Sequence, residues 1–227
     1  MTANDKPRGR RRRPEHEATE KVLAAAEEQL RQEELDLFTV DRVLERAGES
    51  VGTFYRRFSG KNALLHAVQD RLHARIQPPI LDGLQAQEHL GQSLEETADR
   101  AFSIVIENIL KERQLCRAFL MLAAFDPVIR RKIREVEVQH RQALAAVLAA
   151  HRSEIEHPDP DEAIHHAYHM YLSTMHGRLV FFDPMSNLSG GVSDGAIFSQ
   201  LKLAISNFLR GNHGGGSRSA EATPPTE

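Results

Sequence analysis

The segment from Thr39 to Lys61 concentrates side chains that suit the surface of duplex DNA. From Thr39 to Phe58 it reads TVDRVLERAGESVGTFYRRF. Arginine binds guanine edges or phosphates, and hydroxyl groups bind phosphates or bases. If this stretch ends in a helix, Phe54 and Phe58 share one face of it. The opposite face and its flanks carry a polar set of side chains, namely Gly52, Thr53, Tyr55, Arg56 and Arg57. Gly52 costs about 1 kcal/mol of helix stability, but it lets a backbone approach a groove closely.

Two short helices are expected to position these side chains. Apolar residues at i, i+3, i+4 and i+7 predict a helix after Thr39, which suits the N-cap, and Gly48 suits the position just past its end. Ser50 can cap a second helix through Phe58. Two short helices joined by a glycine-containing turn have the layout of a helix-turn-helix, whose second helix enters the major groove. Short amphipathic helix pairs also occur in proteins that never touch DNA, so this alternative stays open at the level of pattern.

The N-terminus is strongly basic, with Lys6, Arg8 and Arg10 to Arg13 in close succession. The formal net charge of the chain is −3, so the rest of the chain is acidic by comparison. A basic arm on an acidic body is common in nucleic-acid binders, because phosphates attract local rather than global positive charge. The alternative is a disordered tail that only keeps the chain in solution.

Helical spacing of apolar residues continues through most of the chain, which predicts an all-α fold of about nine helices. We expect a first helix from about residue 15 to 33 and a fourth helix that begins after Ser59 and is broken by Pro78-Pro79. The later helices are expected near 94–111, 115–124, 127–151, 160–182 and 194–210. Ser93 with Glu96 forms a capping-box pattern, and Asp126-Pro127 and Asp159-Pro160 are typical helix starts.

The segment from Thr39 to Leu65 resembles the N-terminal domain of the TetR family of regulators. The resemblance lies in Thr39-Val40, Glu45 to Gly48, Ser50 to Arg56, Phe58, Lys61 and Ala63 to Leu65. It implies that Thr39, Tyr55 and Lys61 hold phosphates and that Val51, Gly52, Thr53 and Arg56 face the groove. The predicted DNA-binding set is completed by Ser50, Arg57 and three arginines of the arm, Arg10, Arg12 and Arg13. Leu44 and Glu49 depart from the family pattern, which normally has a small and an apolar residue there.

The same resemblance implies how the chain is divided. We expect a disordered basic arm over residues 1–13, a helix-turn-helix domain over 14–60, a helical effector-binding and dimerisation domain over 61–210 and a disordered tail over 211–227. The last two helices would form a four-helix bundle with those of a second copy. Among the middle helices, apolar side chains are expected to line an effector pocket, namely Phe102, Ile106, Ile109, Phe119, Leu122, Phe125 and Tyr168. These residues are also suited to a plain core.

The expected function is therefore that of a homodimeric, sequence-specific regulator of transcription, a repressor released from a palindromic operator by a small-molecule effector. The alternative is a helical dimeric interaction module that has lost DNA binding. No nucleophile elbow, P-loop or dinucleotide motif indicates an enzyme, and no cofactor is expected.

The single cysteine, Cys116, and the lack of a membrane-spanning run favour the cytoplasm. His165, His166, His169 and His176 include an i, i+4 pair, but without cysteine or HExxH partners we expect surface or interface histidines and no metal site.

Overall fold

The computed structural model describes residues 9–32, 35–89, 92–181 and 191–211. Within these ranges the chain forms nine α-helices and no strand, so the predicted all-α class is confirmed. The helices are α1 (Gly9–Gln32), α2 (Val40–Ala47), α3 (Val51–Tyr55), α4 (Lys61–Gln85), α5 (Leu94–Lys111), α6 (Arg113–Leu122), α7 (Pro127–Ala149), α8 (Pro160–Val180) and α9 (Asp194–Leu209). Short 3₁₀ turns lie at Leu35–Leu37, Ala86–His89 and Arg152–Glu154.

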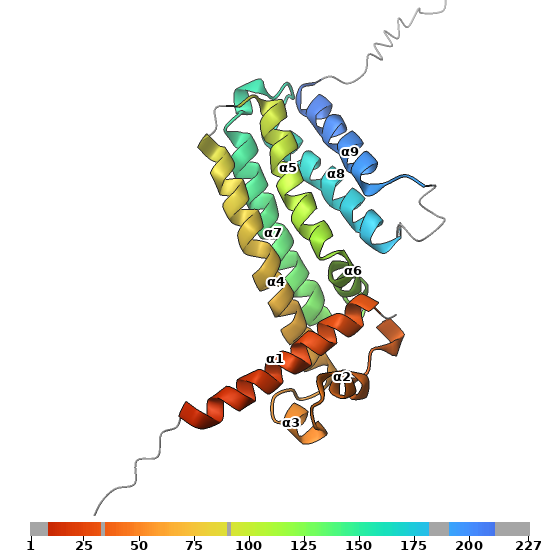
Figure 1. Ribbon diagram of the computed structural model, residues 1–227. Helices are drawn as coiled ribbons and strands as arrows, with labels where there is room; N and C mark the ends of the chain where they lie inside the picture. The colour runs from red at the N-terminus through yellow and green to blue at the C-terminus, as the bar shows by residue number, and fades with distance from the viewer. Residues whose placement is uncertain (1–8, 33–34, 90–91, 182–190, 212–227) are drawn as a thin grey trace, which may run out of the picture.

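The molecule consists of a small helical head and a long helical bundle (Figure 1). Helix α1 runs across the lower end of the bundle, α2 and α3 lie beneath it, and α4 rises from this head along the whole bundle beside α7 and α5. Two hydrophobic clusters hold the fold together. One joins α1 to α3 with the first half of α4 and with α6, and the other joins the second half of α4 with α5, α7, α8 and α9. Helix α4 and helix α6 therefore connect the head to the bundle.

Local signals in the sequence set most helix starts. Ser93 and Glu96 form the predicted capping box at the start of α5, in which each side chain bonds the backbone N–H of the other residue. Asp126 and Asp159 accept backbone N–H groups at the starts of α7 and α8, where a proline occupies the first helical position. These predicted boundaries are confirmed.

Helix α4 does not end at Pro78-Pro79 as predicted but continues to Gln85. Both prolines are exposed, whereas Ile76, Ile80 and Leu84 are buried on the other side of the helix. A proline inside a helix costs roughly 3 kcal/mol, because it removes a backbone hydrogen bond. Burial of a large aliphatic side chain returns about 1.5–3 kcal/mol, so three of them offset much of the cost of both prolines.

Two other boundaries differ from the prediction by three residues or more. Helix α3 ends at Tyr55 rather than at Phe58, and α1 begins at Gly9 rather than near residue 15. The segment 9–13, predicted as part of a disordered arm, is thus helical. Arginine is a good helix former and the basic segment is continuous with the amphipathic part of α1, which favours propagation of the helix toward the N-terminus. Residues 1–8 of the arm and 212–227 of the tail lie outside the described ranges.

Candidate nucleic-acid interface and effector cavity

Helices α2 and α3 form the predicted helix-turn-helix. Thr39 caps α2 by accepting the backbone N–H of Arg42, with a distance of 3.4 Å between Thr39 Oγ1 and the nitrogen. Gly48 follows the helix with φ of 65°, the left-handed conformation that glycine adopts without strain. Ser50 then caps α3, with 3.1 Å between its Oγ and the backbone nitrogen of Thr53. Each cap predicted from the sequence is therefore present in the turn.

Helix α3 is anchored by its phenylalanines and presents its other side to solvent. Phe54 and Phe58 are buried in the hydrophobic cluster of the head, with 5.4 Å between their ring centroids. Val51 and Tyr55, in contrast, are 54% and 60% exposed, although both are large. The rest of the outward side comprises Ser50, Gly52, half-buried Thr53, Arg56 and Arg57. This face is the one that the sequence predicted to read DNA.

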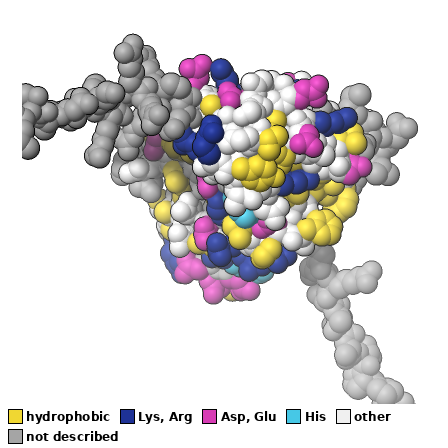
Figure 2. Space-filling model, turned by 90° about the horizontal axis from the view of Figure 1, so that it is seen from below, with side chains coloured by type: hydrophobic (Ala, Val, Ile, Leu, Met, Phe, Trp, Pro, Cys, Tyr) yellow, Lys and Arg dark blue, Asp and Glu magenta, His cyan; other side chains and the backbone are white. Residues whose placement is uncertain are grey.

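Hydrogen bonds within α3 hold part of this face in a defined arrangement. Arg56 Nη2 donates to Thr53 Oγ1 over 3.2 Å, and the hydroxyl oxygens of Thr53 and Ser50 are 3.0 Å apart. The guanidinium of Arg56 keeps further donors for a base edge, because arginine has five N–H groups. The end of the molecule that includes α2 and α3 displays basic, acidic and hydrophobic side chains close together (Figure 2).

Lys61 occupies the first turn of α4, as the phosphate-binding prediction requires, but its ammonium has an internal partner. Lys61 Nζ donates to the carbonyl oxygen of Phe38 over 2.7 Å and lies 5.2 Å from the centroid of the Phe38 ring. The residue is exposed, as is the adjacent Thr39. Contact with Phe38 therefore places the ammonium beside Thr39, the other residue predicted to hold a phosphate on this side.

The remaining predicted DNA contacts come from α1. Arg10, Arg12 and Arg13 belong to its first turns, and their side chains lie outside the described part of the structure. Of the two residues that depart from the family pattern, Leu44 is buried in the cluster of the head and Glu49 is half-buried in the turn. The head thus accommodates Leu44 as a core residue.

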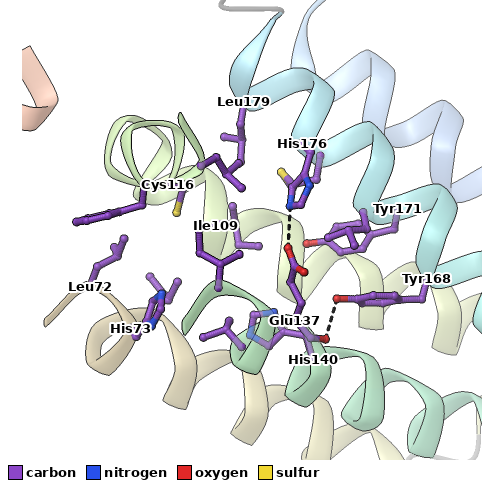
Figure 3. Close-up of a pocket in the computed structure, with 17 residues that line it drawn as sticks. Leu72, His73, Ile109, Cys116, Glu137, His140, Tyr168, Tyr171, His176 and Leu179 are labelled. Atoms are coloured by element: carbon purple, nitrogen blue, oxygen red, sulfur yellow. Dashed lines mark hydrogen bonds and ion pairs between the residues drawn. The ribbon is translucent and has the colours of Figure 1, made fainter. Parts of the chain in front are cut away.

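A cavity of about 80 Å³ opens in the bundle, between α4, α5, α6, α7 and α8 (Figure 3). This is larger than the roughly 10–15 Å³ that one water molecule needs. Most of its seventeen lining residues are apolar, including Leu72, Ile76 and Phe119. These three also belong to the hydrophobic cluster of the head. The cavity is therefore in direct contact with the core that carries the helix-turn-helix.

The polar part of the cavity is centred on Glu137 of α7. His176 Nε2 lies 3.1 Å from Glu137 Oε1, and the Tyr168 hydroxyl donates to the Glu137 backbone carbonyl over 2.8 Å. His140 Nε2 lies 3.0 Å from Gln77 Oε1, and burial lowers the pKa of His140 to about 4. Burial also lowers the pKa of His73, against the opposing effect of Asp70. Sequence reasoning missed Glu137, His140 and His73, because no local motif brings α4, α7 and α8 together.

The sequence similarity to known proteins lies mainly in the head. Residues 22–68 match the model of the bacterial regulatory proteins of the tetR family. The head of this chain is therefore similar to the N-terminal part of that family. An uncharacterized HTH-type transcriptional regulator, YvdT of Bacillus subtilis strain 168, is 34% identical over 85 residues, which are 37% of this chain and 44% of that relative. The match thus spans less than half of the length of the relative.

Solved structures, among them one named as a tetR-family protein, share the fold over most of the chain. A bacterial regulatory protein of the tetR family from Rhodococcus RHA1 is 16% identical and superimposes with a TM-score of 0.63, covering 85% of this chain and 96% of the other. The SmeT–triclosan complex is 17% identical with a TM-score of 0.60, covering 84% and 90%. At these identities the likeness extends to the fold, a helix-turn-helix head on a helical bundle.

Within this TetR-like bundle, only part of the predicted effector set reaches the cavity. Ile109, Phe119 and Tyr168 line it. The remaining members, Phe102, Ile106, Leu122 and Phe125, do not, and this part of the prediction is corrected. Phe102 and Ile106 are buried in the core of the bundle, and Leu122 packs half-buried against the head. Phe125 is 90% exposed, because α6 ends at Leu122 and the following turn directs it to solvent.

A cluster of five charged side chains ties the head to the bundle. Glu27 of α1 contacts Arg31, Arg71 and Arg75 at N···O distances of 3.1, 3.0 and 3.2 Å. Glu112, between α5 and α6, contacts Arg31 at 3.0 Å and Arg75 at 2.6 Å. Burial raises the pKa of Glu112, but the bonds from Arg75 and Arg31 outweigh it and hold that pKa below its ordinary value. The cluster therefore links α1, α4 and the start of α6.

The four histidines singled out in the sequence do not form one cluster, and Cys116 lines the cavity together with only one of them, His176. His165 and His169 lie on the surface of α8 with 3.0 Å between their Nε2 atoms, whereas His176 lines the cavity. No group of three or more potential metal-binding side chains occurs among the residues described. Burial raises the pKa of Cys116 to about 12, so its thiol stays protonated, as expected of a residue packed like a small hydrophobe.

None of the described helices combines the length and apolar composition needed to cross a lipid bilayer.

Proposed function

We propose that this chain is a sequence-specific DNA-binding transcriptional regulator that places α3 in the major groove. The proposal rests on the outward face of α3, where Val51, Tyr55 and Arg56 are exposed while Phe54 and Phe58 fix the helix to the head. A large apolar side chain such as Val51 gains nothing from exposure on a free protein, but it can contact a thymine methyl in the groove. Gly52 beside it allows close approach of the backbone to the bases.

Two kinds of contact are assigned to this face. Thr39, Tyr55 and Lys61 are proposed to bind phosphates and set the position of the head, with Ser50 and Arg57 at the flanks and the α1 arginines Arg10, Arg12 and Arg13 along the backbone. Val51, Gly52, Thr53 and Arg56 are proposed to face base edges. An arginine that contacts a guanine in two places contributes about 1–3 kcal/mol of discrimination.

A second copy of the chain is proposed to pair through α8 and α9. Leu203 on α9 is 50% exposed, and Ala204 beside it is exposed as well. Pairing across these helices would cover this apolar surface and supply two reading heads for a palindromic site.

An effector in the cavity is proposed to control DNA affinity, with the protein acting as a repressor that the effector releases. Leu72 and Ile76 of α4 and Phe119 of α6 contact both the cavity and the core of the head, so a molecule that displaces them also moves α3. A coupling of about 1–3 kcal/mol would change DNA affinity five- to 150-fold. SmeT, whose fold this chain shares, has been solved in complex with a small molecule, triclosan.

The test is selection of binding sites from randomised duplex DNA by the full chain, followed by fluorescence anisotropy with the selected site. Tyr55→Ala is expected to weaken binding to all sequences, while Arg56→Ala weakens binding and relaxes preference at one base pair. Arg100→Ala, an exposed arginine on α5, serves as the matched control and is expected to bind as the parent chain does. Failure to select any sequence would refute the proposal and favour a helical interaction module. Equal, uniform losses in both α3 variants would refute the assigned roles.

A further inference from the structure

The hydroxyl of Tyr171 is the feature of the cavity that the fold itself does not explain. Tyr171 is 1% exposed and its ring packs against those of Phe102 and Tyr168, with centroid distances of 5.7 and 5.8 Å. It lines the cavity, and its hydroxyl forms no hydrogen bond with any residue that the structure describes. Tyr168 next to it, in contrast, donates to the Glu137 carbonyl. A buried phenolic hydroxyl normally has a partner, so this one points to a group supplied from outside the chain.

The charges around the cavity restrict what that outside group can be. Glu137 contributes the carboxylate, and Figure 3 shows the Tyr171 hydroxyl directed toward it from α8. None of the described residues that line the cavity is lysine or arginine. A bound carboxylate or phosphate would therefore lie near Glu137 without a permanent cation to compensate it, which is unfavourable in a poorly solvated site.

His140 and His73 add no permanent positive charge to the cavity. Since burial lowers the pKa of His140 to about 4, this side chain is neutral near pH 7. The Nε2 of His140 faces the Gln77 side-chain carbonyl oxygen at 3.0 Å, so Nε2 carries the proton and Nδ1 is left as an acceptor. Burial also lowers the pKa of His73, which lies at the α4 side of the cavity. The polar groups of the cavity therefore include the Glu137 carboxylate and His140 Nδ1 as acceptors, together with one hydroxyl that can donate or accept.

We propose that the cavity binds a compact, largely apolar molecule that carries an uncharged hydroxyl donor, such as a phenol or an alcohol, and that it excludes carboxylates and phosphates. The apolar part of the ligand contacts Leu72, Ile76 and Phe119, while its hydroxyl bonds Tyr171 and the acceptors beside it. This inference rests on the proposed function, since it names the chemical class of the effector.

Isothermal titration calorimetry of the full chain with three matched probes tests the ligand class. The probes are 4-ethylphenol, ethylbenzene and 4-ethylbenzoate, which share a skeleton and differ in the polar group. We expect 4-ethylphenol to bind about tenfold more tightly than ethylbenzene, the factor expected for one hydrogen bond, and 4-ethylbenzoate not to bind measurably. Binding of the benzoate as tight as that of the phenol, or no saturable binding of any probe, would overturn the proposal.

Two variants then separate the hydroxyl contact from the apolar contacts. Tyr171→Phe is expected to reduce the tenfold preference for 4-ethylphenol to about twofold or less while leaving the affinity for ethylbenzene unchanged. Tyr55→Phe, which removes the same atom from an exposed ring on α3, is the control and should keep the preference. Glu137→Gln removes the negative charge and is expected to allow measurable binding of 4-ethylbenzoate. An unchanged preference in Tyr171→Phe, or continued exclusion of the benzoate by folded Glu137→Gln, would contradict the assignment.

Because the calorimetry contains no DNA, its result tests the ligand class independently of the proposed DNA-binding function. If 4-ethylphenol binds with the expected preference but leaves DNA affinity unchanged, the ligand class stands and the effector role fails. If the chain selects a DNA site but shows no preference among the probes, the regulator stands and the ligand class fails.

Discussion

Replacing Glu27 with glutamine keeps the shape of the side chain and removes one charge from the cluster between the head and the bundle. The Glu27 side chain is only 6% exposed, and it faces three guanidinium groups at N···O distances of 3.0–3.2 Å. Removal of one partner from a buried ion pair typically costs roughly 3–5 kcal/mol, because the opposite charge is left uncompensated. The three arginine side chains are 32–36% exposed, so water and Glu112 compensate part of the loss. We therefore expect Glu27→Gln to lower the free energy of unfolding by about 2 kcal/mol.

Urea denaturation followed by circular dichroism at pH 7 measures this change. With an m-value of about 2 kcal/mol/M, the midpoint should fall by about 1 M. Glu17→Gln is the matched control on the same helix, because Glu17 pairs with Lys21 at 3.3 Å while the Lys21 and Glu17 side chains are 51% and 69% exposed. This control should change the free energy by less than about 0.5 kcal/mol. Equal effects of the two substitutions would show that Glu27 behaves as an ordinary surface charge and would refute the reasoning.

The remaining predictions concern two glycines and one buried histidine. Gly52→Ala is expected to stabilise the free protein by up to about 1 kcal/mol in urea titrations, since a Cβ there meets only Ser50 Oγ at 3.8 Å, yet to weaken DNA binding in anisotropy. Gly48→Ala should lower the free energy of unfolding by about 1 kcal/mol, because φ of 65° is strained for alanine although the space is open. Since the pKa of His140 is about 4 in the fold and 6.5 in the unfolded chain, the unfolded chain binds the additional proton between these values. Unfolding free energy should therefore fall by about 2 kcal/mol from pH 6.5 to pH 5, and a folded His140→Leu variant should flatten this dependence.

The helix-turn-helix was predictable from the sequence because its determinants are local. Thr39 and Ser50 bond backbone groups three residues away. Gly48 adopts the left-handed conformation at its own position without strain. The burial of Phe54 and Phe58 follows from their spacing on one helix face. The DNA-binding role of each exposed residue on α3 stays a prediction, since it depends on a molecule outside the chain.

The cavity in the bundle and the charge cluster were not predictable in the same way. Cavity-lining residues such as His73, Glu137 and Tyr171 come from three helices, and Arg31 meets Glu112 across 81 positions in the chain. Spacing within a helix indicates which face is buried but not which other helix covers it. For that reason Phe102 and Phe125, equally plausible as lining residues in the sequence, lie in the core and in solvent respectively.

By itself, the sequence determined where most helices begin and which face of α3 is directed outward, because caps, glycine conformations and helical periodicity act over a few residues. Tertiary structure alone decided that α4 continues through Pro78-Pro79, that Glu137 lies beside Tyr171 and that Glu27 holds three arginines. Each of these depends on packing between helices distant in the chain, where burial of apolar side chains outweighs a local preference or brings separate charges together.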